Sequence, residues 1–156
     1  ENLKMAKPDA MKEEMEAVLQ KINLLGFLQT QDGLQTQLLE KASNLSGGQC
    51  QRLVIARALL KEDSKVYIFD EAASNIDVES EELIMNVIHN LAKTKTVLLI
   101  SHRLANVVKS DKIYFLKDGE IKESGKHEEL MSQNGAYRHL YESQMALENY
   151  GKGGMA

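Results

Sequence analysis

The sequence predicts an α/β fold with a parallel-sheet core, a helical lobe before it and helices after it. Two short runs, residues 66–69 and 97–100, are apolar on both faces, which is typical of parallel strands covered by helices on either side. The residues between them, 79–91, carry an apolar stripe at helical spacing. Strand, helix and strand in this order predict a βαβ crossover.

The composition is that of a globular chain. With 156 residues, 43% of them hydrophobic, and one proline, the chain is long enough for one domain with a core. The net charge of −4, without a cluster of Lys and Arg, argues against a nucleic-acid partner. The single cysteine, Cys50, excludes an intrachain disulfide and favours a reducing compartment. The apolar runs are much shorter than a membrane span, so we expect the chain itself to be soluble.

Residues 1–44 are predicted to form the helical lobe. Pro8 ends a short amphipathic segment, and the pair Pro8-Asp9 is expected to open a helix with Asp9 near its positive end. The apolar residues that follow recur at helical spacing, and we interpret their stripe as core rather than as a binding surface. Its members are Met11, Met15, Val18, Leu19 and Ile22.

The next segment, residues 45–62, contains a helix with a strong start signal. Ser46 is a good N-cap, and Gln49 completes a capping box three residues later. Gly47 and Gly48 follow the cap and leave backbone N–H groups uncovered at the positive end of the helix dipole. Such an end suits a phosphate or another anion, although glycine after a cap often only shapes a turn.

Residues 63–150 are interpreted as the C-terminal part of the α/β core. After the second strand, an apolar run at 113–116 and the turn pair Asp118-Gly119 predict a hairpin. Helices are expected at about 127–132 and 136–147, and residues 151–156 are predicted to be a flexible tail.

Polar residues follow both predicted parallel strands. Asp70 and Glu71 follow the first strand, and Ser101 and His102 follow the second. Ligands in open α/β sheets bind beyond the carboxyl ends of the strands, so we expect these side chains to form a site. Asp70 suits Mg²⁺, Glu71 suits the activation of a water molecule, and His102 suits a phosphate oxygen or that water. Taken singly, each feature more often belongs to an ordinary loop, but their joint occurrence with the capped glycine motif favours a site.

In this order, these stretches resemble the nucleotide-binding (ATPase) domain of an ABC transporter of the exporter type, over nearly the whole chain. Residues 45–58 resemble the signature motif and its helix, 66–71 the Walker B motif with its catalytic glutamate, 74–77 the D-loop and 100–103 the switch-histidine loop. Residues 118–121, 125–130 and 135–137 are similar to the ends of exporter-type members.

The resemblance implies a partial P-loop NTPase-like fold, ATP and Mg²⁺ as cofactors, and a place at the cytoplasmic face of a membrane. It implies Glu71 and His102 as catalytic residues, Asp70 as the Mg²⁺ residue acting through water, and an ATP contact at Ser46, Gly47, Gly48, Gln49 and Asp77. The implied partners are a transmembrane domain and a second ABC nucleotide-binding domain, as a homodimer or a heterodimer. In such a dimer the signature motif of one domain caps the ATP that the other domain holds.

The sequence departs from the family because it contains no P-loop of the form Gly-x-x-x-x-Gly-Lys-Ser/Thr. The segment from Gly119 to Lys126 is one residue too long, and His127 follows it. We therefore interpret the chain as a C-terminal fragment of the domain. Alone, it is expected to bind ATP weakly, to hydrolyse it negligibly, and to associate through exposed strand edges.

Two other functions fit part of this pattern. A soluble ABC ATPase of DNA repair or translation would be expected to carry basic patches or coiled-coil inserts, and the sequence shows neither. A catalytically inert module that acts only in subunit association is disfavoured for the parent protein by the presence of Glu71 and His102, but it suits the fragment.

Overall fold

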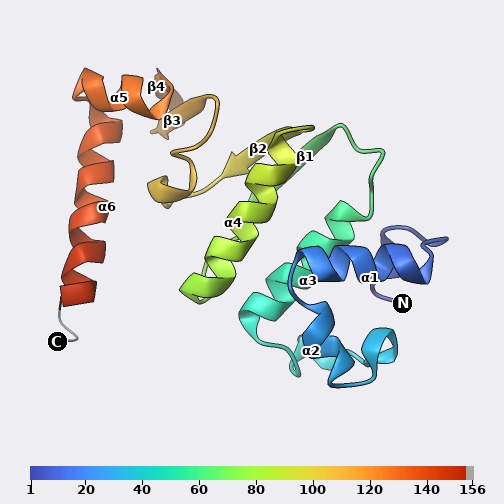
Figure 1. The fold of residues 1–156 in the computed structure, drawn as a ribbon. Helices are drawn as coiled ribbons and strands as arrows, with labels where there is room; N and C mark the ends of the chain where they lie inside the picture. The colour runs from blue at the N-terminus through green and yellow to red at the C-terminus, as the bar shows by residue number, and fades with distance from the viewer. Residues whose placement is uncertain (154–156) are drawn as a thin grey trace. The chain divides into compact units, whose positions relative to one another are not determined.

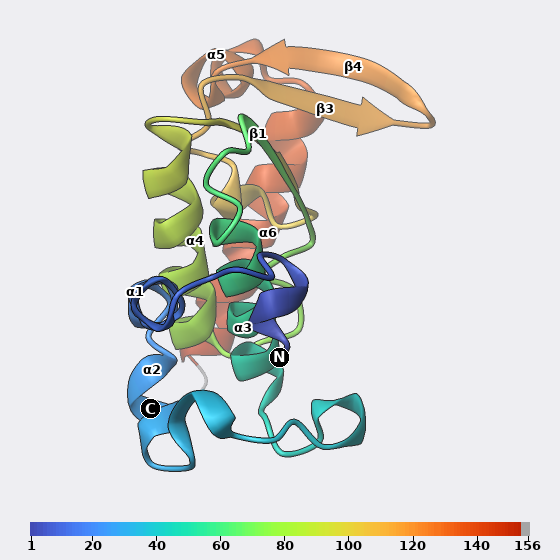
Figure 2. The ribbon, with the colours of Figure 1, turned by 90° about the vertical axis from the view of Figure 1, so that its right-hand side faces the viewer.

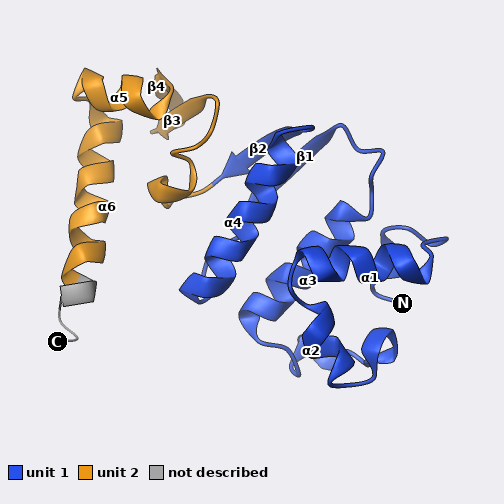
Figure 3. Cartoon of the chain, viewed as in Figure 1, with its two compact units in different colours: residues 1–100 blue, residues 101–156 orange. Residues whose placement is uncertain are grey.

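The computed structural model describes the backbone of residues 1–153 and the side chains of residues 1–150. The chain divides into two compact units, Glu1–Ile100 and Ser101–Ala156 (Figure 3). Each unit contains its own helices and its own two-stranded sheet. The α/β fold class predicted from the sequence is confirmed.

The first unit contains a parallel pair of strands (Figure 1). Strand β1 (Val66–Asp70) pairs with β2 (Thr96–Ile100), in a register that joins Val66 to Thr96 and Asp70 to Ile100. Helix α4 (Val78–Ala92) connects the strands and packs against β2 and α3 (Gly47–Leu59). Helices α1 (Lys12–Lys21) and α2 (Leu25–Gln29) pack against each other, and α1 also contacts α3. The predicted βαβ crossover is confirmed.

One hydrophobic core joins all parts of the first unit. Tyr67 and Phe69 point from β1 into this core, where their rings stack with centroids 6.4 Å apart. Leu19 and Ile22 from the predicted helical lobe are fully buried in the same core, together with Ile84 of α4. Burying a side chain of this size stabilises the fold by about 1.5–3 kcal/mol. The residues before α3 therefore share their core with the sheet.

One face of the β1–β2 sheet is exposed, which differs from the prediction. Val66, Ile68, Leu98 and Ile100 are exposed, with Ile68 65% accessible, whereas both strands were expected to be covered on both faces. The reason is the twofold alternation of a strand, which directs successive side chains to opposite faces. Within the described residues, the helices of the first unit cover only the face that carries Tyr67 and Phe69.

Helix α1 begins later than the sequence predicted. Met11 is its N-cap, with φ −70° and ψ 159°, so Asp9 lies before the helix and Glu13 and Glu14 occupy its first turn. The extended backbone of Met11 takes its side chain off the apolar face, and the residue is 62% exposed. Its assignment to the core was wrong, whereas that of Val18, Leu19 and Ile22 is confirmed.

The second unit contains the predicted hairpin and two helices. Strands β3 (Ile113–Lys117) and β4 (Glu120–Gly125) pair antiparallel around Asp118 and Gly119, which both have positive φ, as a tight hairpin turn requires. Helix α5 (His127–Gln133) packs against β4 and lies beside the hairpin in Figure 2. Helix α6 (Ala136–Gly153) follows and packs against α5.

Helix α6 is longer than predicted. It continues through residues 151–153, the first part of the predicted flexible tail, while residues 154–156 lie outside the described part of the chain. Once nucleated, a helix gains one hydrogen bond for each residue added, so the sequence after Leu147 can extend it. Among the described residues, no helix combines the length and the apolarity that a membrane span needs.

Candidate active site

The predicted capping box at the start of α3 is present. The backbone N–H of Gln49 donates to Ser46 Oγ (3.2 Å), and Gln49 Oε1 accepts from the backbone N–H of Ser46 (2.8 Å). No oxygen among the described residues accepts from the backbone N–H of Gly47 or Gly48. These two donors therefore remain at the positive end of a helix, where an anion is favoured. The side chain of Gln49 takes part in the cap.

Gly48 allows the start of α3 to approach the start of α4 closely. A Cβ atom at Gly48 would lie 2.5 Å from Ser80 Oγ and 3.1 Å from Asp77 Oδ2. At Gly47, a Cβ atom would meet only the backbone oxygen of Asn75, at 3.9 Å. The segments that resemble the signature motif and the D-loop are therefore neighbours in the first unit, although the sequence separates them by the whole of α3 and β1.

Asp77 is the N-cap of α4. Its Oδ1 accepts from the backbone N–H of Ser80 at 2.8 Å. This bond from the Ser80 backbone, with the Ser80 side chain next in importance, holds the pKa of the Asp77 carboxyl below its ordinary value, because both stabilise the charged form. The positive charge of Arg52 acts in the same direction with a smaller effect. Asp77 thus carries a negative charge close to Gly48, and it also stabilises helix α4 as its N-cap.

The acidic pair lies at the carboxyl end of β1. Asp70 is the last residue of the strand and is exposed. Glu71 has φ 51°, a left-handed backbone that is uncommon for residues other than glycine and that costs of order 1–3 kcal/mol. Its N–H donates to the Ile100 oxygen (3.0 Å), and its own carbonyl accepts from the N–H (3.0 Å) and Oγ (2.8 Å) of Ser74. Six other non-glycine residues of the described chain have a similar positive φ, so this conformation orients Glu71 but does not by itself mark a functional residue.

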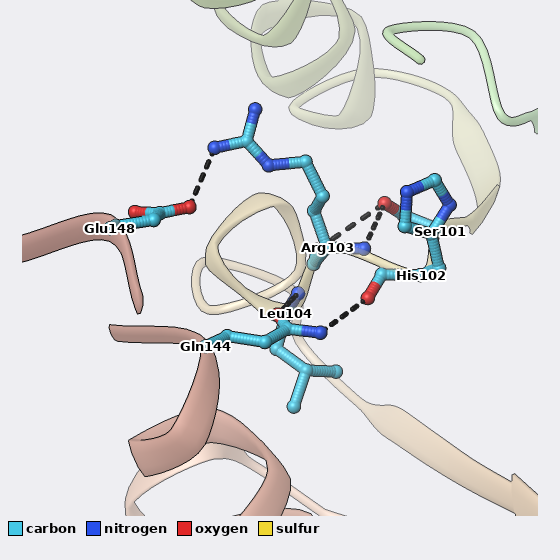
Figure 4. Close-up of polar contacts among 6 residues, drawn as sticks. All are labelled: Ser101, His102, Arg103, Leu104, Gln144 and Glu148. Atoms are coloured by element: carbon cyan, nitrogen blue, oxygen red, sulfur yellow. Dashed lines mark hydrogen bonds and ion pairs between the residues drawn. The ribbon is translucent and has the colours of Figure 1, made fainter. Parts of the chain in front are cut away.

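His102 lies in the second unit, just after strand β2. Its side chain is exposed, and its backbone oxygen accepts a hydrogen bond from Gln144 of α6 (Figure 4). The prediction that His102 acts together with Asp70 and Glu71 stays a prediction. The structure brings together, in the first unit, the residues for which the sequence predicted an ATP contact: Ser46, Gly47, Gly48, Gln49 and Asp77.

Sequence reasoning missed Ser80 and Gln144. Ser80 is 6% exposed and fills the space opposite Gly48, and Gln144 contacts the loop of His102. Ser80 lies within the local cap of α4, but neither its contact with Gly48 nor the contacts of Gln144 follow from a local motif. The only sequence signal at Gln144 is its spacing of four residues from Glu148, which places both on one face of α6.

The residues present fit Mg²⁺ and a phosphate. Mg²⁺ usually keeps several waters and binds proteins through one or two carboxylates together with phosphate oxygens, so the exposed Asp70 is a suitable ligand. Among the described residues, no three His, Cys, Asp or Glu side chains gather in a way that could hold a metal ion. The backbone donors of Gly47 and Gly48 suit the terminal phosphate of a nucleotide.

Comparison with known proteins identifies the family. The sequence model of the ABC transporter family matches residues 1–74. An uncharacterized ABC transporter ATP-binding protein of Haemophilus influenzae is 51% identical over 95% of this chain. The chain belongs to the ABC transporter ATP-binding proteins. The ATP-dependent lipid A-core flippase of Mannheimia succiniciproducens, another relative, is 45% identical over 89% of the chain.

A solved structure agrees with this family. A bacterial Atm1-family ABC exporter with ATP bound matches 92% of the chain, with a TM-score of 0.82 and 30% sequence identity. The chain spans about a quarter of the length of these ABC relatives, with 26% of the Haemophilus protein, 24% of the Mannheimia protein and 25% of the Atm1-family exporter covered.

Proposed function

We propose that this chain supplies the signature, Walker B, D-loop and switch-histidine elements of the ATP-hydrolysing domain of an ABC exporter. The observation that carries the proposal is the acidic pair Asp70 and Glu71 at the carboxyl end of the parallel strand β1. The names of the lipid A-core flippase and of the Atm1-family exporter support export as the process that the ATP drives.

Each residue of the proposed site has a role that its chemistry permits. Asp70 would hold Mg²⁺ through water, and the ion would supply positive charge to the phosphates. Glu71 accepts a proton from the attacking water or orients it, since a carboxylate at this position can do either. His102 donates a hydrogen bond to a phosphate oxygen or positions the water.

The signature helix acts on a second nucleotide. Ser46, Gly47 and Gly48 at the start of α3 cap the γ-phosphate of an ATP held by a second ABC nucleotide-binding domain, in a homodimer or a heterodimer. Gln49 completes the cap at this helix start, and Asp77 caps the start of the neighbouring helix α4. A transmembrane domain is the other proposed partner, which puts the site at the cytoplasmic face of a membrane. Since the sequence has no P-loop, the 156-residue chain alone hydrolyses ATP negligibly.

The substitution Glu71→Gln in the complete natural polypeptide tests the proposal. It keeps the shape of the side chain and removes the base, so we expect ATP hydrolysis to fall by at least about 100-fold while ATP binding is retained. Glu82→Gln, an exposed change of the same kind on α4, is the matched control and should leave hydrolysis intact. Undiminished hydrolysis by the Glu71→Gln protein, or an equal loss in both proteins, would refute the role of Glu71.

A further inference from the structure

Two polar side chains of helix α6 contact the loop that carries His102 (Figure 4). Gln144 Nε2 donates to the backbone oxygen of His102 (2.8 Å), and the backbone N–H of Leu104 donates to Gln144 Oε1 (2.9 Å). Four residues further along, Glu148 forms an ion pair with Arg103 at 2.7 Å. We propose that Gln144 is a positioning residue for His102, a role that rests on the function proposed above for this histidine.

The two partners of Gln144 determine the orientation of its amide. A backbone carbonyl can only accept and a backbone N–H can only donate, so Nε2 must face His102 and Oε1 must face Leu104. Glutamate has the same length but no donor for the His102 oxygen, and alanine has neither group. Among side chains of this length, only an amide satisfies both bonds at once.

Two further contacts lie in the same loop. Ser101 Oγ accepts from the N–H of Arg103 (3.1 Å) and donates to its carbonyl oxygen (3.3 Å), which closes a short turn around His102. The Arg103 and Glu148 side chains are 37% and 36% exposed, so their ion pair contributes little. Gln144 bonds the backbone of His102 itself and of Leu104, so its loss removes two contacts that act directly on the backbone that carries the imidazole.

Helix α6 is itself held at its N-terminal end, away from Gln144. The Glu123 carboxylate of β4 accepts from the backbone N–H of Ala136 (2.6 Å) and of Tyr137 (3.3 Å). Tyr137 is fully buried, and its ring packs edge-on against Phe115 at a centroid distance of 6.1 Å. Tyr137 and Gln144 are seven residues apart, so they lie on the same face of the helix. The hairpin therefore supports one end of this face, and the His102 loop contacts the other.

The test compares Gln144→Glu and Gln144→Ala with the unaltered protein, all as the complete natural polypeptide. We expect both changes to lower kcat for ATP hydrolysis by about tenfold or more, because a small displacement of an aligned group is costly. The KM for ATP should stay within about twofold, since the loss concerns the transition state. Ser143→Ala, an exposed neighbour on α6 that bonds only within its helix, is the control and should keep kcat.

A His102→Ala background separates the inference from the proposed function. If Gln144 acts through His102, Gln144→Ala adds no further loss in this background. An additional loss of the same size there, or an unchanged kcat in Gln144→Ala when His102→Ala lowers it, overturns the positioning role and leaves that of His102 standing. An unchanged kcat in His102→Ala itself overturns the proposed role of His102, and the inference with it.

Amide hydrogen exchange gives a second readout that needs no activity. Loss of the acceptor in Gln144→Ala should speed exchange at Leu104, while exchange in the hairpin at residues 113–125 stays unchanged and reports an intact fold. Unchanged protection of Leu104 in a folded Gln144→Ala protein contradicts the proposal.

Discussion

At the scale of single residues, Gly48 shows why a motif residue can be needed for packing as well as for chemistry. A methyl group there would lie 2.5 Å from Ser80 Oγ and 2.9 Å from Ser80 Cβ, and Ser80 is buried. We expect Gly48→Ala to lower the free energy of unfolding by about 1–3 kcal/mol, the usual cost of overpacking. Urea denaturation followed by circular dichroism measures the change.

Gly47 is the matched control for Gly48. Its added methyl group would meet only the Asn75 oxygen, at an ordinary contact distance of 3.9 Å, and alanine favours a helix more than glycine does. Gly47→Ala should therefore leave the free energy of unfolding unchanged or raise it slightly. Equal urea midpoints for the two variants would show that the close approach of α3 and α4 is not needed for stability.

Asp77 should make stability depend on pH. Its pKa is lowered in the folded chain, chiefly by the backbone hydrogen bond from Ser80, so its contribution is complete above the unfolded value of about 3.9 and is lost as the pH falls through the folded value. Asn caps helices well but does not titrate. As the pH falls from about 6 to about 3, we expect the unaltered protein to lose more free energy of unfolding than Asp77→Asn does.

A second neutral cap tests whether charge causes this pH dependence. Asp77→Ser also removes the titrating group while retaining a side-chain oxygen for the Ser80 N–H. Across the same pH range, the difference in urea midpoint between each variant and the unaltered protein should then change in the same way for both variants. A stability difference that stays constant with pH in both would contradict the role of the ionised carboxylate.

At the scale of elements, the Glu123 carboxylate of strand β4 caps the start of helix α6. Glu123 accepts from two backbone N–H groups of the first turn, and a Cβ atom at Gly135 would approach its oxygens to 2.6 Å. Glu123→Ala should lower the free energy of unfolding by about 1–2 kcal/mol, because a helix cap and its favourable charge are lost together. Thermal unfolding and amide exchange at residues 136–137 measure the effect.

Glu120 provides the control for this helix cap. It lies on the same strand and is exposed, and it pairs only with Lys122 on the surface. Glu120→Ala should change stability by less than about 0.5 kcal/mol and leave exchange at residues 136–137 as it was. Equal effects of the two substitutions would indicate that the general charge of the hairpin, and not the cap, stabilises α6.

Elements with local signals were predictable from the sequence. The Ser46 and Gln49 capping box, the βαβ unit and the Asp118-Gly119 hairpin each depend on neighbouring residues, and the structure contains all of them. The start of α1 was misplaced because proline and aspartate at 8–9 imitate a helix start, whereas Glu14 bonds the backbone N–H of Met11.

The parts of the candidate site that depend on local sequence were predictable as well. Asp70 and Glu71 follow a strand in the sequence, so their place at its carboxyl end could be inferred. The left-handed backbone of Glu71 and the contact between Gly48 and Ser80 depend on the packing of segments distant in sequence. The bonds of Gln144 to residues 102 and 104 depend on the same long-range packing, which no local pattern encodes.

At the scale of the whole molecule, the exposed face of the β1–β2 sheet should govern how the isolated 156-residue chain behaves in solution. Val66, Ile68, Leu98 and Ile100 are each at least 45% exposed on this face, and adjacent apolar side chains of this kind favour association. A two-stranded sheet also has unpaired edges that can bind another chain.

We therefore expect the isolated chain to self-associate as its concentration rises, and Ile68→Lys to weaken this association, because a charge at the centre of the face must be desolvated on contact. Val54→Lys is the matched control, since Val54 is 56% exposed but lies on α3, away from the strands. Sedimentation velocity over a range of concentrations measures the association of all three proteins. A monomer at every concentration, or equal weakening by both lysines, would show that the sheet face is not the associating surface.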